Sequence, residues 1–184
     1  MQRKILIAAF LVASVPAFAD TMEPSVRVGG QAMVPSKTIV TNAVNSADHT
    51  TLVTAVKAAG LVDTLNSKGP FTVFAPTNEA FGMLPAGTVE TLVKPESKAT
   101  LTKVLTYHVV AGDYDTTKLR SMILAGNGTA ELKTVEGGRL WLTMNGSSNI
   151  LVKDEKGSVA DITISDVHQS NGVIHVVDHV LMPG

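Results

Sequence analysis

Two stretches decide the fold of this chain, Phe71-Thr-Val-Phe-Ala-Pro-Thr-Asn-Glu-Ala-Phe81 and Asn171-Gly-Val-Ile-His-Val-Val-Asp-His-Val-Leu-Met-Pro183. The first opens with an aromatic and β-branched run that predicts a short buried strand closed by Pro76. The second is apolar on both faces of a strand, with Ile174, Val176, Val180 and Met182 on one face and Val173, Val177 and Leu181 on the other. A strand that is apolar on both faces belongs in the interior, so both stretches are interpreted mainly as folding elements.

The first half of the chain has helical periodicity. Helices are expected over residues 39–44, 48–59, 61–65, 88–93 and 97–106, with Asp48 as a cap and Gly60 as a stop. Thr77-Asn78-Glu79 predicts a capped helical turn through Phe81. Tyr107-His108-Val109-Val110 returns to strand character.

The second half alternates between apolar and polar residues. Leu140, Leu142 and Met144 face one way, and Arg139, Trp141 and Thr143 face the other. Gly137-Gly138, Asn145-Gly146 and Asn171-Gly172 separate such runs and predict hairpin turns. Helices first and hairpins last indicate an α+β domain with a mainly antiparallel sheet.

The N-terminus predicts export. Gln2-Arg3-Lys4 is followed by an apolar run and by Ala17-Phe18-Ala19, so residues 1–19 are interpreted as a signal peptide cleaved before Asp20. The alternative is an uncleaved membrane anchor, which the shortness of the run disfavours. Residues 20–36 are polar with Pro and Gly and predict a flexible arm, which leaves 37–184 as the domain.

Composition narrows the possible partners. Removing 19 of 184 residues leaves 165, a length suited to one domain with one sizeable core. The loss of Arg3 and Lys4 lowers Lys+Arg from 15 to 13 against 16 Asp+Glu, a formal charge near −3. That balance disfavours nucleic acid and anionic membranes as partners. The absence of cysteine excludes disulfides and thiolate chemistry.

The two quoted stretches, with Tyr107-His108 between them, make the chain similar to the fasciclin domain family from about Lys37 to Gly184. The resemblance implies a wedge of two short β-sheets with helices packed on one side and the two stretches as neighbouring central strands. It also implies an adhesion role. In animal relatives the Tyr-His neighbourhood and an Asp-Ile pair contribute to receptor contact; the corresponding pair here is Asp166-Val167. The alternative for Tyr107-His108 is structural, with the Tyr107 ring packed inside and His108 bonded to a strand neighbour.

Several polar residues of the two stretches are predicted to be structural. His175 falls where the family also has histidine and is expected to be buried and hydrogen-bonded. Asp178 needs donors if it lies inside an apolar strand. Backbone amides or hydroxyls of a neighbouring segment are expected, with Thr72 and Thr77 as candidates. Replacing Asp178 with Ala is therefore expected to lower the melting temperature. The complete set predicted to be structural is Phe71, Thr72, Phe74, Pro76, Thr77, His175 and Asp178.

Signatures of catalysis and of cofactor binding do not occur in the sequence. His175 and His179 would lie about 13 Å apart along a strand, too far for one metal ion. The chain has no Gly-x-Ser-x-Gly elbow, phosphate loop or dinucleotide fingerprint. We therefore expect no enzyme activity, cofactor or metal.

The sequence favours a secreted or periplasmic adhesion or interaction module that binds a cell-surface or matrix protein or glycan, or another copy of itself. No stable membrane insertion is expected after signal cleavage. Trp141 is the favoured surface contact, because its strand neighbours Arg139 and Thr143 are polar. The alternative is a periplasmic binding protein for a small apolar or carbohydrate ligand, which would need a pocket of several hundred Å³ between helices and sheet.

Overall fold

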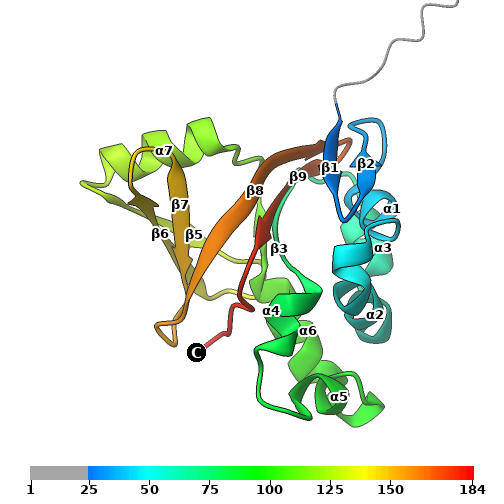
Figure 1. Ribbon diagram of the computed structural model, residues 1–184. Coiled ribbons are helices and arrows are strands. Elements are labelled where there is room, and N and C mark those ends of the chain that lie inside the picture. The colour runs from blue at the N-terminus through cyan, green and yellow to red at the C-terminus, as the bar shows by residue number, and fades with distance from the viewer. Residues whose placement is uncertain (1–24) are drawn as a thin grey trace, which may run out of the picture.

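The computed structural model describes residues 25–184 and contains one bent seven-stranded sheet with helices on both sides (Figure 1). The predicted signal peptide and the start of the predicted arm lie outside the described residues. The strand order is β4-β3-β9-β8-β7-β6-β5. The strands are β3 Phe71–Pro76, β4 Val109–Ala111, β5 Thr129–Lys133, β6 Arg139–Asn145, β7 Asn149–Lys153, β8 Val159–Gln169 and β9 Gly172–Val177.

The two stretches quoted first are β3 and β9, and they pair in the interior of the sheet. Their parallel register runs from Phe71 opposite Gly172 to Pro76 opposite Val177. All other neighbouring strands pair antiparallel. Every residue of β9 is buried, as expected for a strand with two apolar faces. The α+β class and the central position of both stretches are confirmed.

Strand β8 bends the sheet into a wedge. Its first residues pair with β7, while Ile162 to Gln169 pair with β9 through two register shifts. Such bulges bend a strand and increase its twist. The β5–β7 part therefore diverges from the β3–β9 part, as Figure 1 shows.

The helices are α1 Ile39–Ala43, η1 Ala47–His49, α2 Thr50–Ala59, α3 Val62–Asn66, α4 Asn78–Gly82, α5 Thr88–Leu92, η2 Pro95–Ser97, α6 Lys98–Tyr107 and α7 Thr116–Ala125. Helices α1 to α6 lie on the β3–β9 side and share a core cluster with Ile174 and Val176. Helix α7 packs against β5 and β6, where Leu119 and Ile123 fill a second cluster with Val177 and Leu181. The prediction that the helices pack on one side of the sheet is therefore confirmed for all of the helices except α7.

The predicted flexible arm is wrong from Val26 onward. Val26–Val28 (β1) and Gln31–Met33 (β2) form an antiparallel hairpin. Val28 and Met33 are only 1% and 2% exposed and belong to the core of the helical side. The sequence did not predict this hairpin, because each strand has only three residues and one buried side chain. Strands this short show no repeating apolar pattern.

Two local predictions also need correction. Tyr107 and His108 are not in a strand, because Tyr107 ends α6 and His108 is its C-cap. Asp48 does not cap α2; Asn78 Oδ1 accepts the Thr51 N–H at 3.0 Å instead. The cap at Thr77 is confirmed, since its hydroxyl accepts the Ala80 N–H. Gly60 ends α2 with φ 74°, a conformation that glycine adopts without strain.

Candidate functional site

Three of the five residues predicted to make surface contacts are buried. Tyr107 and Val167 are 0% exposed, and His108 is 2% exposed. A side chain at that depth cannot touch a partner in this fold, so a direct contact role for these three is wrong. The family resemblance identified the matching positions in this chain. The sequence alone did not show that these three side chains are buried.

Tyr107 holds the loop between β7 and β8. Its hydroxyl donates to the Arg139 carbonyl at 2.6 Å and accepts the Glu155 N–H at 3.0 Å. Burial raises the pKa of Tyr107 to about 12. Hydrogen bonds from the Gly184 and Arg139 N–H groups lower the pKa of the exposed Glu155 carboxyl.

His108 fastens the C-terminal segment to α6. Its Nδ1 donates to the Val104 carbonyl at 2.8 Å, and its Nε2 accepts the Leu181 N–H at 2.9 Å. Only a neutral imidazole can donate from one nitrogen and accept at the other. Burial lowers the pKa of His108 to about 4, in agreement with this pattern.

Asp166 binds the first residue of α7, whose N-cap is Asp115, rather than presenting an open carboxylate. Its side chain accepts both the N–H of Thr116, at 2.7 Å, and the Thr116 hydroxyl. Its φ of 56° lies in the left-handed region, which Asp tolerates better than most residues. Half-buried Asp166 therefore orders the bulge of β8 and the start of α7 together.

The predicted structural residues have mainly backbone partners. His175 Nε2 donates to the Tyr114 carbonyl at 2.8 Å, and the His175 ring stacks on Phe74 at 5.8 Å. Burial lowers the pKa of His175. Thr72 donates to the Gly112 carbonyl and accepts the Tyr114 N–H. These contacts support structural roles for His175 and Thr72.

Asp178 has a backbone amide of a neighbouring strand as its partner, as predicted, but not the hydroxyl of Thr72 or Thr77. It follows the end of β9, and its Oδ1 accepts the Asp161 N–H at 2.7 Å. The same oxygen lies 2.8 Å from Nδ1 of His179. Its side chain is 37% exposed, so it is not the buried charge expected from the sequence, and Thr72 and Thr77 are bonded elsewhere.

Trp141 lies in an open groove on the outer face of the β5–β8 part of the sheet. Its strand neighbours Leu140 and Leu142 are fully buried, so the indole points to the opposite, outer face. The groove has a volume of about 610 Å³ and continues along the loop between β7 and β8. It is lined by Thr129, Trp141, Thr143, Leu151, Lys153, Asp154, Glu155, Lys156, Gly157 and Val159.

The strand register arranges the groove floor in two rows. Glu131, Trp141, Lys153 and Val159 are successive cross-strand partners in one row, and Thr129, Thr143, Leu151 and Asp161 in the next. Directly opposed residues have Cβ atoms about 5 Å apart. Lys153 is therefore the direct cross-strand neighbour of Trp141.

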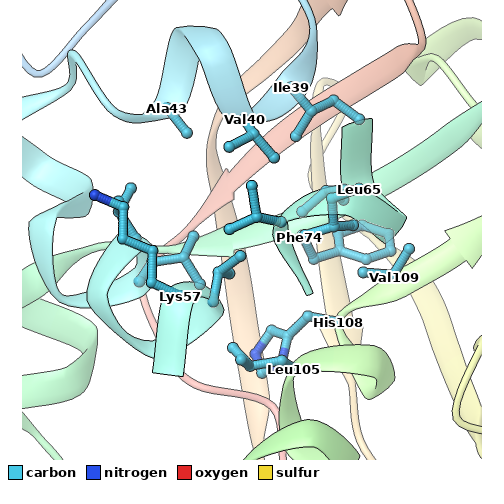
Figure 2. Close-up of a pocket in the computed structure, with 14 residues that line it drawn as sticks. Ile39, Val40, Ala43, Lys57, Leu65, Phe74, Leu105, His108 and Val109 are labelled. Carbon is cyan, nitrogen blue, oxygen red and sulfur yellow. The ribbon is translucent and has the colours of Figure 1, made fainter. Parts of the chain in front are cut away.

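A second cavity lies between the helices and the sheet and is apolar. Its volume is about 50 Å³, and Figure 2 shows Val40, Leu65 and Phe74 converging on it, with the Lys57 amino group directed away. Pockets for small ligands occupy about 300–1,000 Å³. This cavity cannot hold a sugar, so it does not favour the ligand-binding alternative.

Residues 25–184 contain no group of three or more His, Cys, Asp or Glu side chains placed to hold a metal ion. Within the same range, every helix is too short or too polar to cross a bilayer.

Sequence reasoning found Trp141 but missed most of the groove around it. Leu151 and Lys153 lie on β7, a strand that was not predicted. The alternation of Ile150 and Val152 with Leu151 and Lys153 could have predicted this strand. The sequence does not give the strand register, which sets Lys153 opposite Trp141.

Comparison with known proteins agrees with this fold. The family model for the fasciclin domain matches residues 47–183. "Protein sll1483" of Synechocystis is 45% identical over 89% of this chain and 83% of its own length. "Immunogenic protein MPB70" of Mycobacterium bovis is 38% identical over 76% of this chain and 65% of its own length.

Two further comparisons come from animals. "Transforming growth factor-beta-induced protein ig-h3" of Sus scrofa is 39% identical over 72% of this chain, which corresponds to 17% of that protein. The solved FAS1 domain pair of the insect cell adhesion molecule fasciclin I superposes with a TM-score of 0.71 at 17% identity, over 88% of this chain and 58% of that one. By sequence and by fold, this chain belongs to the fasciclin domain family.

Proposed function

We propose that this chain is an exported, non-catalytic interaction module that attaches to a cell-surface or matrix component through the groove around Trp141. Fasciclin domains occur in proteins named for adhesion and for the cell surface, such as fasciclin I and the "cell surface glycolipoprotein MPB83" of Mycobacterium bovis. These names support a location outside the cytoplasm, and the pattern of residues 1–19 is the basis for proposing a secreted or periplasmic one.

The observation that carries the proposal is an accessible Trp141 in a groove of about 610 Å³. Tryptophan is enriched at the energetic centres of binding surfaces, because one flat ring supplies a large contact area. Leu151 and Val159 extend the apolar part of the groove.

Two of the three histidines buried among residues 25–184, His108 and His175, support a non-catalytic role. His108 and His175 each use one ring nitrogen to donate to a backbone carbonyl and the other to accept a backbone N–H. Both rings are buried and bond only backbone groups, so a substrate in solvent cannot reach them.

The proposal is tested with purified mature protein and the cell-envelope and matrix fractions of the producing cells. Trp141→Ala should reduce cosedimentation at least tenfold, since truncating such an anchor costs about 2 kcal/mol or more. Met83→Ala is the matched control, because Met83 is 60% exposed on the helical side. A Trp141→Ala protein that folds and binds like the unmodified chain would refute the proposed site.

A further inference from the structure

The groove around Trp141 combines an aromatic surface with cations that have no ion-pair partner. Lys153 and Lys156 line it and are exposed. Among the described residues, the ion pairs are Lys103 with Glu136, Arg139 with Glu131, and His179 with Asp178. Neither groove lysine is among them.

The carboxylates near these lysines already have partners. Glu131 pairs with Arg139 at 3.3 Å. Asp154 accepts the backbone N–H groups of Lys156, Ser158 and Met182. Glu155 accepts the N–H groups of Arg139 and Gly184. These contacts engage the carboxylate oxygens, although Asp154 and Glu155 keep their charge and line the groove as well. In the described part of the chain, the Lys153 and Lys156 ammonium groups are the charged groups of the lining that have no hydrogen-bond or ion-pair partner.

Two of the polar groups on the floor are hydroxyls. Thr129 and Thr143 are cross-strand partners and line the groove beside Trp141. A flat ring flanked by hydroxyls and ammonium groups complements a ligand with apolar ring faces, many hydroxyls and negative charge.

The position of the groove disfavours an extended peptide. Peptides that add to a sheet need a free strand edge. Strands β6 and β7 are hydrogen-bonded on both sides, so the floor of the groove is a sheet face rather than an edge.

We propose that this groove binds a segment of an acidic polysaccharide containing uronic acid residues. One sugar ring stacks on Trp141, while carboxylates of the same or the next residue contact Lys153 and Lys156. This inference rests on the proposed function and specifies the chemistry of the partner.

The chain has one tryptophan, so its fluorescence reports directly on the groove. Polygalacturonate is titrated into the mature protein, and fully methyl-esterified polygalacturonate serves as a probe with the same rings but neutral carboxyl groups. We expect a saturable fluorescence change with the acid form and at least tenfold weaker binding of the ester. Binding should also weaken as salt rises from 20 to 300 mM, because exposed charges are screened.

Variants assign the contacts. Lys153→Gln with Lys156→Gln should weaken binding of the acid form at least tenfold, while Lys94→Gln with Lys98→Gln, on the helical side, should leave it unchanged. Trp141→Ala, followed by affinity electrophoresis in polygalacturonate gels, should lose retardation. Equal binding of acid and ester, or of the groove-lysine variant and the unmodified chain, would overturn the charge assignment.

Two outcomes separate this inference from the proposed function. If poly-glutamate binds and polygalacturonate does not, the partner is an acidic peptide and the polysaccharide assignment is wrong. If envelope binding depends on Trp141 but polygalacturonate does not bind, the acidic polysaccharide is refuted and the proposed function stands. If envelope binding does not depend on Trp141, the proposed function itself fails.

Discussion

His108 links helix α6 to the C-terminal segment through both of its ring nitrogens. Protonation would remove the acceptor that holds the Leu181 N–H and would place a charge in a site that is 2% exposed. The fold therefore requires the neutral ring, and burial lowers the pKa of His108 from 6.5 to about 4.

This requirement predicts a loss of stability in acid. The unfolded chain takes up a proton at His108 below pH 6.5, whereas the folded chain does so only near pH 4. The stabilisation is complete above pH 6.5 and is lost as pH falls toward 4, by an amount on the order of 3 kcal/mol. Urea unfolding at pH 7 and pH 4.5 measures it.

His108→Gln serves as the control, because burial also lowers the pKa of His49 and His175. The variant should be less stable than the unmodified chain at pH 7 but should lose less stability between the two pH values. Identical losses in both proteins would show that His108 does not carry the effect.

At the scale of elements, the helices meet the sheet with a small gap. The apolar cavity of about 50 Å³ is bordered by α1, α2, α3 and α6 and by β3 and β4. Voids of this kind forfeit contacts for the side chains that line them. The helical side is therefore packed below its optimum.

Filling the cavity should stabilise the fold. Val56→Ile adds one methylene from α2 at the cavity wall, which is expected to contribute about 0.8 kcal/mol and to raise the melting temperature by about 2–4 °C. Val177→Ile is the matched control, since Val177 is fully buried outside the cavity lining and extra volume there should not stabilise. A gain for Val177→Ile but none for Val56→Ile would contradict this account.

At the scale of the whole molecule, the N-terminal hairpin belongs to the folded domain. Val28 and Met33 are buried in the cluster that also holds Ile174 and Val176. The Gly29 carbonyl accepts the Ala47 N–H, which ties the hairpin to η1. The stable unit therefore begins before Lys37.

Removing the hairpin should weaken the whole domain. A chain that starts at Lys37 loses two buried side chains worth about 1.5–3 kcal/mol each, and its melting temperature should fall by roughly 10 °C. The double substitution Val28→Ala with Met33→Ala, made in the chain that keeps the hairpin, should reproduce most of this fall in melting temperature. If the chain starting at Lys37 has the same melting temperature as the chain that includes the hairpin, the hairpin does not contribute to the stability of the domain.

Local signals in the sequence were sufficient for the main strands and for several ends of elements. The continuous apolar run of β9 predicted its burial, and Gly60 and Thr77 predicted a helix end and a helix start. Trp141 was placed on the outer face because alternation within one strand fixes which side chains point the same way. Each of these features depends on residues close together in the chain.

The tertiary structure alone decided what the polar residues do. Tyr107 bonds across 32 positions to Arg139, Asp166 across 50 to Thr116, and His108 across 73 to Leu181. The groove likewise depends on the register that sets Lys153 opposite Trp141. Periodicity along the chain determines which face a side chain occupies, but burial and partners depend on which distant segments cover that face, and only packing fixes that choice.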